Sequence, residues 1–343
     1  MGWQDKEGDI YFIIVWLIFK DSSSIVSLIS SENIKRFILC NYNLYTKKVI
    51  PFRNGVQNNN FMILADKDRF VFRVYNRKTI NELKYTIQIL HVLQKNSFPS
   101  PEIIHTLNNK WSIEFEGKPC ILYRYIQGDN IKEVSTDLIR QIGRLQGWMH
   151  TLLTNERQND EALTWDYDDL LIIIDKNRYH IESKFSDLIG GFRFIEDELL
   201  KIPFADSLLK GGTHQDIKPE NVLVRNKNIV AGFVDFDNGY YGVLLNDITT
   251  VICWYCFIDN RLDLRLFEGF VKSYNKERAL TDAEKDFFYQ GLKYRLLREA
   301  VIWPIYVSFK IDIARKRFNY FLGLYNNLNI YKRDILNIVN FRG

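Results

Sequence analysis

The sequence from Gly211 to Asn221 reads Gly-Gly-Thr-His-Gln-Asp-Ile-Lys-Pro-Glu-Asn, and the apolar run Val222 to Val224 follows it directly. The polar residues of this stretch are spaced H-x-D-x-x-x-x-N, and they are His214, Asp216 and Asn221. Two acidic residues, Asp235 and Asp237, follow at the end of the next apolar run. Because two apolar runs flank a turn at residues 225–228, we expect a hairpin that brings the two polar groups together.

These residue types are the ones that phosphoryl transfer requires: a carboxylate near the attacking hydroxyl, and an amide and a carboxylate that hold Mg²⁺ over the phosphates. We predict Asp216 as the catalytic base. Asn221 and Asp235 are the predicted metal ligands, because Mg²⁺ prefers oxygen atoms. His214 is expected to pin the loop by hydrogen bonds. Lys218 lies two residues after the base, where it either touches the transferred phosphoryl group or is solvated.

Composition limits the possible functions. The chain has 343 residues, which is enough for two lobes, and a formal net charge of only +4. Lys and Arg are interspersed with Asp and Glu, so the sequence does not indicate a nucleic-acid partner. Four cysteines are too few for a disulfide framework and favour a reducing, cytoplasmic location. The C-x-x-C pair Cys253 and Cys256 lies in an apolar run without a second pair, so we predict core residues.

The N-terminal segment does not indicate a membrane protein. The apolar run Ile10 to Phe19 is too short to cross a bilayer, and acidic residues precede it. We therefore expect neither a targeting signal nor a membrane partner. Residues 1–40 are predicted to be an N-terminal extension with a short helix near Ser31 to Cys40.

Residues 41–126 are predicted to form a lobe rich in antiparallel strands. Apolar and β-branched residues alternate in runs separated by turns, and the expected strands are Val49–Arg53, Phe61–Ala65, Phe70–Tyr75, Trp111–Glu116 and Cys120–Ile126. One helix is expected from Thr79 to Gln94, before the prolines at 99 and 101. Residues 127–343 are predicted to form a larger helical lobe, which includes helices over 131–153 and 186–200.

The loop and the Asp-Phe-Asp resemble those of the aminoglycoside phosphotransferase, choline kinase and type II homoserine kinase superfamily, the small-molecule relatives of protein kinases. The resemblance covers most of the chain from about Tyr42. It implies an α+β fold that is bilobal and protein-kinase-like, with a small antiparallel β-rich N-lobe and a larger, mainly α-helical C-lobe. It also implies that the protein uses ATP and Mg²⁺, and that Asp247 braces the catalytic loop.

The same resemblance assigns the nucleotide-binding residues. Gly55 and Asn58 belong to a turn similar to the one that lies over the ATP phosphates. Arg73 stands on the strand that carries the phosphate-binding cation, where many kinases have lysine. The usual helix glutamate falls near Thr86, so Glu82, one turn earlier, is the candidate partner of Arg73. The strand into the hinge carries Tyr123 and Tyr125, and backbone groups there are expected to take the adenine.

A protein Ser/Thr kinase is the main alternative, because His-Gln-Asp-Ile-Lys-Pro-Glu-Asn is close to the loop of those enzymes. Against it, the sequence has no G-x-G-x-x-G-x-V and no V-A-I-K strand. Gln215 replaces the arginine that pairs with an activation-loop phosphate, and Asp247 follows Asp235 too closely for such a loop. A catalytically inactive kinase-like binding module is the other alternative, but Asp216, Asn221 and Asp235 are all present.

The sequence leaves the acceptor open, and we expect a hydroxyl group of a small molecule, either an aminoglycoside antibiotic or an amino alcohol such as homoserine. An amino acid requires a cation for its carboxylate, and Arg295 and Arg298 are candidates. A cationic acceptor requires acidic or aromatic walls, and the candidates are Asp237, Asp259, Asp263, Glu299, Trp254, Tyr255 and Trp303. The oligomeric state is not predicted.

Overall fold

The computed structural model describes residues 29–52, 58–157, 165–203, 207–307 and 310–340. The chain divides into two compact units, Met1–Ile126 and Gln127–Gly343. The apolar run at 10–19 lies outside the described residues.

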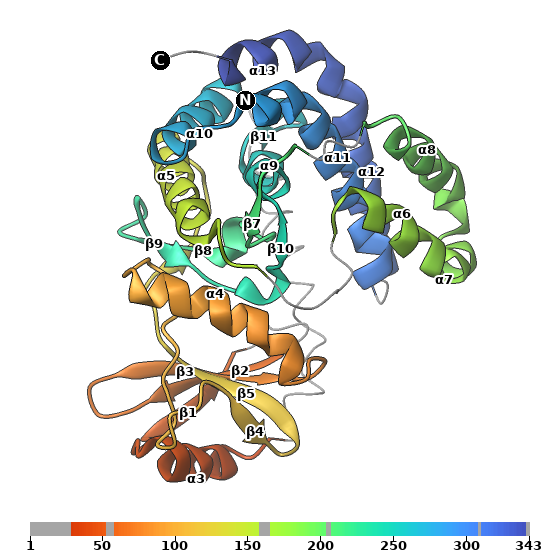
Figure 1. Cartoon of the computed structure of the whole chain (residues 1–343). Helices are drawn as coiled ribbons and strands as arrows, with labels where there is room; N and C mark the ends of the chain where they lie inside the picture. The colour runs from red at the N-terminus through yellow and green to blue at the C-terminus, as the bar shows by residue number, and fades with distance from the viewer. Residues whose placement is uncertain (1–28, 53–57, 158–164, 204–206, 308–309, 341–343) are drawn as a thin grey trace, which may run out of the picture. The chain divides into compact units, whose positions relative to one another are not determined.

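A five-stranded antiparallel sheet forms the centre of the first unit, in the order β1-β2-β3-β5-β4 (Figure 1). Its strands are β1 Lys48–Pro51, β2 Asn58–Leu64, β3 Arg69–Tyr75, β4 Ile113–Phe115 and β5 Lys118–Arg124. These five expected strands are present, with shifts of a few residues at their ends. A further strand is expected to begin at Ile103 and Ile104, but Ile103 forms only an isolated bridge with Tyr123.

Helix α3 (Ser31–Tyr42) covers one face of this sheet. Ile34 and Ile38 pack into a core with every second residue of β2 and β3, among them Phe61 and Phe72. The period of two in a strand sends the intervening residues to the opposite face. The region that the sequence predicted as an extension therefore ends in a helix that belongs to the core of the first unit.

On the other side of the sheet lies α4 (Lys84–Lys95), which follows the short 3₁₀ helix η1 (Asn81–Leu83) (Figure 1). Ile89, Leu90 and Leu93 are buried, as the predicted helical spacing requires. The helix ends at Lys95, and Ser97 then takes a left-handed φ of 54°, so the chain has left the helical path before the first proline.

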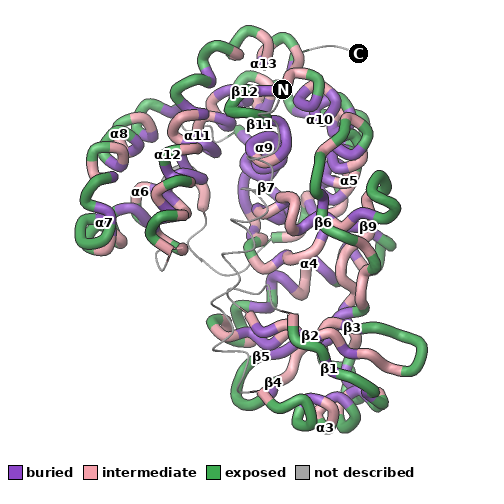
Figure 2. The backbone as a smooth tube through the Cα atoms, turned by 180° about the vertical axis from the view of Figure 1, so that it is seen from behind, coloured by how far each residue is buried: buried purple, intermediate pink, exposed green. Residues whose placement is uncertain are grey.

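The second unit is mainly helical (Figure 1). Its α-helices are α5 Thr136–Leu153, α6 Tyr167–Lys176, α7 Arg178–Lys184, α8 Ile189–Leu199, α9 Leu244–Tyr255, α10 Leu264–Glu277, α11 Asp282–Tyr306, α12 Ile311–Asn327 and α13 Lys332–Val339. Its 3₁₀ helices are η2 Ser186–Leu188, η3 Pro219–Asn221, η4 Phe236–Asn238 and η5 Leu328–Tyr331. Helix α9 is buried along almost its whole length, and Figure 2 shows it as the centre of this unit.

Helices α5 and α10 pack closely because α5 carries two glycines one turn apart. A Cβ atom at Gly143 would lie 2.7 Å from the carbonyl oxygen of Phe270, and one at Gly147 would lie 2.8 Å from that of Tyr274. The two backbones therefore approach each other over these positions. This contact holds α5, and with it His150, in a fixed position in the second unit.

Short sheets frame the predicted loop. They are β6 (Asp129–Asn130) with β8 (Val222–Arg225) and β9 (Ile229–Phe233), β7 (Lys210–Gly212) with β10 (Tyr241–Val243), and β11 (Phe257–Ile258) with β12 (Arg261–Leu262). The predicted hairpin is β8–β9. The loop thus leaves β7 and enters β8, and both ends are held by strand pairing.

All four cysteines are free thiols, and Cys253 and Cys256 are buried core residues as predicted. In the part of the chain that the structure describes, no helix is both long enough and apolar enough to span a bilayer.

Candidate active site

The carboxylate of Asp247 on α9 holds the loop in place. Its oxygens accept hydrogen bonds from the backbone amides of His214 (2.9 Å) and Gln215 (2.6 Å) and from Nε2 of His150 (2.9 Å). The side chain is fully buried. The bracing role predicted for Asp247 is confirmed. Because two consecutive amides are bound to one carboxylate, the direction of the backbone just before Asp216, the predicted base, is fixed.

The surroundings of Asp247 favour its charged form. Burial raises the pKa of this carboxyl, but the hydrogen bonds from His150 and from the amide of His214 outweigh burial and lower it to about 2. Burial lowers the pKa of His150, which keeps this imidazole neutral. Its Nε2 donates to Asp247, so its Nδ1 accepts a hydrogen bond from the hydroxyl of Tyr274 (2.8 Å).

Gln215 is the second point at which the loop is held, and it has the left-handed φ of 63°. Its side-chain oxygen accepts hydrogen bonds from Arg295 (3.1 Å) and Arg298 (2.5 Å), and its carbonyl oxygen accepts another from Arg295 (3.1 Å). Both arginines stand on α11 and are at most 2% exposed. Arg295 also pairs with Glu299 (2.5 Å). The prediction that these arginines bind a substrate carboxylate is therefore wrong, because they are buried against the loop.

His214 acts as a scaffold in this structure. Its Nε2 donates to the carbonyl oxygen of Val234 (3.0 Å), and its Nδ1 accepts from the backbone amide of Asp216 (3.3 Å). The ring lies against Phe236, with centroids 4.3 Å apart, and it is fully buried. Both ring nitrogens are engaged with the backbone. The imidazole thus ties the loop to the end of β9.

Asp216 reaches the surface of the second unit with its side chain 17% exposed. Its Oδ2 accepts hydrogen bonds from the side-chain amides of Asn221 (2.9 Å) and Asn238 (3.3 Å), and its Oδ1 lies 3.0 Å from Nζ of Lys218. Burial lowers the pKa of Lys218, but the carboxylates of Asp216 and Glu220 outweigh burial and raise it above its ordinary value. Lys218 is therefore a permanent cation beside the predicted base.

Sequence reasoning missed Asn238, which follows the Asp-Phe-Asp and donates to the predicted base. The signal was its position in a short turn directly after two acidic residues. It also missed Asp166, whose carboxylate joins Tyr240 (3.0 Å) and Asn246 (2.7 Å). Burial raises the pKa of Asp166. This aspartate ties the N-terminus of α6 to the segment that runs from Tyr240 into α9.

The two predicted metal ligands lie at neighbouring strand ends. The backbone amide of Val234 donates to the carbonyl oxygen of Asn221 (2.9 Å), so Asp235 follows next to Asn221. The amide nitrogen of Asn221 donates to the backbone and side-chain oxygens of Asp216, both at 2.9 Å, which leaves Oδ1 directed away from that carboxylate. Asp235 has φ 68° and ψ 64°, an uncommon conformation for a residue other than glycine.

This donor set fits Mg²⁺. The described residues contain no group of three or more His, Cys, Asp or Glu side chains that could hold a metal ion. Mg²⁺ in nucleotide sites needs only one or two carboxylates, because phosphate oxygens and waters complete its six ligands. One amide oxygen and one carboxylate are therefore a sufficient protein contribution.

The first unit carries the predicted nucleotide-binding residues on one face of its sheet. Strand register places Asn58 opposite Tyr75, and Val71 opposite Tyr123. Arg73 is on the same face, which is the face away from α3. Its Nε donates to Oδ1 of Asn60 (2.8 Å). Gly55 lies outside the described residues.

Glu82 does not pair with Arg73. Its carboxylate accepts hydrogen bonds from the amide (2.7 Å) and hydroxyl (2.8 Å) of Thr79, and these bonds lower its pKa. The residue stands in η1, before α4 begins, and its capping role explains why it faces its own turn. The proposed substitution of Glu82 for the usual helix glutamate is therefore wrong.

Several groups of the predicted hinge residues already form hydrogen bonds within the first unit. The amide of Tyr125 donates to the carbonyl oxygen of Arg69 (3.0 Å), and the amide of Arg124 donates to that of Glu102 (2.8 Å). The hydroxyl of Tyr123 is hydrogen-bonded to that of Tyr75 (2.8 Å). The backbone amides of Arg124 and Tyr125 are therefore both engaged within the first unit.

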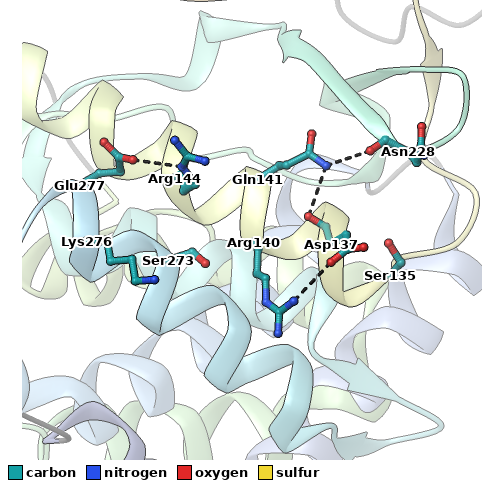
Figure 3. Close-up of a pocket in the computed structure, with 9 residues that line it drawn as sticks. All are labelled: Ser135, Asp137, Arg140, Gln141, Arg144, Asn228, Ser273, Lys276 and Glu277. Atoms are coloured by element: carbon teal, nitrogen blue, oxygen red, sulfur yellow. Dashed lines mark hydrogen bonds and ion pairs between the residues drawn. The ribbon is translucent and has the colours of Figure 1, made fainter. Parts of the chain in front are cut away.

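A hollow of the second unit lies beside α5 and α10, and it is lined by Ser135, Asp137, Arg140, Gln141, Arg144, Asn228, Ser273, Lys276 and Glu277 (Figure 3). Four of its charged side chains form ion pairs: Arg140 with Asp137 (3.3 Å) and Arg144 with Glu277 (3.1 Å). None of the predicted site residues lines it. We therefore place the chemistry at the loop rather than in this hollow.

Comparison with known proteins agrees with this geometry. The model of the phosphotransferase enzyme family matches residues 48–283, well over half of the chain. The chain belongs to this family. The predicted family, the kinase-like fold and the predicted enzyme class, a phosphotransferase with an alcohol group as acceptor, are confirmed.

Several relatives are similar over most of their length. A homoserine kinase of Pseudomonas aeruginosa is 23% identical over 248 residues, which are 71% of this chain and 76% of the relative. A homoserine kinase of Caulobacter vibrioides is 24% identical over 241 residues, 68% of this chain and 73% of the relative. Among solved structures, a microcompartment-associated aminopropanol kinase has a TM-score of 0.66 at 16% identity and covers 89% of this chain and 98% of its own.

Proposed function

We propose that the protein transfers the γ-phosphate of ATP to a hydroxyl group of a small molecule, with Asp216 as the base. The observation that carries this proposal is the fixed position of Asp216. Two amide side chains donate to its Oδ2, and the loop that bears it is held by Asp247 and Gln215. A base that is already positioned needs little reorganisation when the substrate binds.

Each residue of the loop then has one task. Asp216 accepts or orients the proton of the attacking hydroxyl. Lys218 places a cation 3.0 Å from that carboxylate, and this cation would touch the transferred phosphoryl group. Asn221 and Asp235 would hold Mg²⁺ through their side-chain oxygens. When bound, Mg²⁺ neutralises charge that develops on the phosphate oxygens.

The first unit supplies the groups for the nucleotide phosphates in this proposal. Arg73 provides a permanent positive charge that the neighbouring Asn60 orients by its hydrogen bond. Asn58 lies on the same face of the sheet. ATP is the proposed donor, and an amicoumacin kinase of the same fold was solved with AMP-PNP.

A small acceptor is favoured by the path of the chain between the two aspartates. From Asp235 the chain passes through η4 and β10 and enters α9 at Leu244, three residues before Asp247. This segment has no room for an activation loop that would hold an extended peptide. The homoserine and aminopropanol kinases among the similar proteins support an amino alcohol or homoserine-like acceptor. The four free thiols support the predicted cytoplasmic location.

The test is phosphoryl transfer itself. The protein is incubated with Mg²⁺, ATP and a panel of amino alcohols, hydroxy acids and aminoglycosides, and mass spectrometry detects addition of one phosphate. We expect Asp216→Asn to lower kcat by about a thousandfold, because general base catalysis contributes on that order, while nucleotide binding persists. Asp175→Asn, which alters only an exposed ion pair with Arg178, is the control. Unchanged turnover in Asp216→Asn would refute the proposed role.

A further inference from the structure

A buried chain of hydrogen bonds connects Asp247 with the turn between α10 and α11. Nε2 of His150 lies 2.9 Å from the carboxylate of Asp247, and its Nδ1 lies 2.8 Å from the hydroxyl of Tyr274. That hydroxyl accepts a hydrogen bond from Nη1 of Arg278 (2.9 Å), whose Nη2 pairs with Glu284 (2.8 Å). None of these residues is more than 8% exposed. We call His150, Tyr274 and Arg278 the inner chain.

We propose that Arg278 is a positioning residue for the loop that bears Asp216. It keeps His150 neutral, so that the whole charge of Asp247 remains available to the backbone amides that hold the loop. This inference rests on the proposed function, because the position of the loop affects turnover only if Asp216 is the base. Arg278 acts only through the inner chain, so it positions the loop and takes no part in the chemistry.

The first argument is the direction of the hydrogen bonds. A guanidinium can only donate, so the hydroxyl oxygen of Tyr274 is the acceptor in the bond from Arg278. A second cationic donor on the same oxygen would be repelled by the first. Burial raises the pKa of Tyr274, so the hydroxyl keeps its hydrogen and donates it to Nδ1 of His150. The single proton of this imidazole is then on Nε2, where it is directed at Asp247.

The second argument is the charge around His150. The described ionisable groups that act on this imidazole are Asp247 on α9, Tyr274 and Arg278 at the end of α10, and Glu284 on α11. Burial lowers the pKa of His150, and the charge of Arg278 lowers it further, whereas the two carboxylates raise it. Within this set Arg278 supplies the positive charge. Its removal would leave two carboxylates that favour the imidazolium.

The packing of α5 against α10 brings the members of the inner chain together. Gly147 lies about one turn before His150, and a Cβ atom there would lie 2.8 Å from the carbonyl oxygen of Tyr274 and 3.5 Å from the amide nitrogen of Arg278. Because glycine has no Cβ, the end of α10 can approach α5 at this turn. Backbone contact therefore fixes the two positions that supply the hydroxyl and the guanidinium group.

A charged His150 would weaken the support of the loop. An imidazolium would compete for the charge of Asp247, and hydrogen bonds to a fully charged acceptor are the stronger ones. The amides of His214 and Gln215 depend on that carboxylate, and Asp216 follows them directly. We therefore expect loss of Arg278 to lower kcat about tenfold, which corresponds to one weakened hydrogen bond, with little change in KM for ATP.

The protonation state of His150 can be measured without any reference to activity. The chain has five histidines, so the whole protein can be labelled with ¹⁵N-histidine and the signals assigned by single substitutions. NMR then distinguishes a ring nitrogen that bears a proton from one that does not. In the wild type we expect one protonated nitrogen, Nε2, between about pH 8 and about pH 5, the interval in which histidine ordinarily changes its charge.

The residue test removes the charge of Arg278 without leaving Glu284 unpaired. Arg278→Met/Glu284→Gln replaces both partners, and glutamine can keep the capping box with Thr281. We expect both ring nitrogens of His150 to become protonated within the same pH interval in this variant. Glu284→Gln alone is the matched control and should leave His150 neutral, as should Arg278→Lys, which keeps the cation. A His150 that stays neutral in the double variant would overturn the inference.

A milder variant serves if the double variant does not fold. Arg278→Gln/Glu284→Gln keeps a donor for the hydroxyl of Tyr274 and lacks only the charge. His150 should become protonated in this variant at a higher pH than in the wild type. An unchanged titration of His150 would overturn the inference here as well.

Turnover is followed over the same pH interval. The ratio of the wild-type kcat to that of the double variant should grow towards about tenfold as the pH falls, because His150 of the variant then gains its charge. A protonated His150 with a constant ratio would overturn the positioning role of Arg278. If even the wild type transfers no phosphate, the proposed function fails, and the NMR titration still decides whether Arg278 controls the charge of His150.

Discussion

Asp247 is the side chain on which the geometry of the loop depends most. Three donors converge on its carboxylate: two consecutive backbone amides and the imidazole of His150. An asparagine has one acceptor oxygen, and its NH₂ group would face at least one of these donors. The residue is fully buried, so water cannot take over the lost hydrogen bonds.

We predict that Asp247→Asn lowers the free energy of unfolding by about 3 kcal/mol, because it leaves buried donors without an acceptor. It should also reduce kcat, since Gln215 directly precedes Asp216, the proposed base. Urea unfolding and steady-state kinetics measure the two effects. Asp282→Asn is the control, because Asp282 is almost fully exposed and pairs only with Lys285. Similar values for the two variants would contradict the prediction.

The pKa of Asp247 also predicts a pH dependence. Because folding lowers the pKa from 3.8 to about 2, the stabilisation from this residue is complete above pH 4 and is lost as the pH falls towards 2. It amounts to about 2 kcal/mol. The difference in unfolding free energy between the wild type and Asp247→Asn should therefore shrink over this interval. A difference that stays constant from pH 5 to about 2.5 would show that another group is responsible.

At the scale of elements, local patterns of the sequence predict much of the structure. The alternation in β2 and β3 and the spacing in α4 depend on neighbours within a few residues, so the sequence carries them directly. The β8–β9 hairpin was predictable for the same reason. The ends of helices and strands were less predictable. The helix predicted over 131–153 begins only at Thr136, and Ser135 caps it.

Contacts between distant elements were not predictable from such patterns. Arg298 meets Gln215 across 83 residues of sequence, and nothing near either residue indicates that α11 packs on the loop. The error about these arginines follows from this. The prediction that Glu82 pairs with Arg73 failed for a local reason. A capping hydrogen bond from Thr79 to Glu82 competes with the more distant Arg73.

The contact between α5 and α10 gives a prediction at this scale. Gly147→Ala should lower the free energy of unfolding by about 2 kcal/mol, because the new methyl group would lie 2.8 Å from a carbonyl oxygen of α10. Gly323→Ala in α12 is the matched control, since nothing lies within 4 Å of its Cβ position. That change should stabilise the protein by about 0.5–1 kcal/mol. Equal effects in thermal unfolding would contradict the packing argument.

At the scale of the whole molecule, nucleotide and metal are expected to stabilise the fold by mass action. ATP with Mg²⁺ at a hundred times its dissociation constant should raise the free energy of unfolding by about 2.7 kcal/mol. The gain should fall when EDTA removes Mg²⁺, and Asp235→Asn should lose this Mg²⁺-dependent part. Differential scanning fluorimetry with ATP, with and without Mg²⁺, measures both. An Asp235→Asn protein that keeps the full Mg²⁺-dependent shift would contradict the role of Asp235.

The residues that hold the loop lie on α9 and α11, and this limits how the protein can acquire new acceptors. Asp247 and Trp254 share α9, and Arg298 and Trp303 share α11. A movement of either helix that widened the space for a bulkier acceptor would also displace the amides and guanidinium groups that orient the base. Selection for new acceptors in the laboratory should therefore enrich shorter side chains next to the loop, such as at Trp254, whose ring lies 5.9 Å from Nζ of Lys218, while both helices keep their positions and turnover is retained.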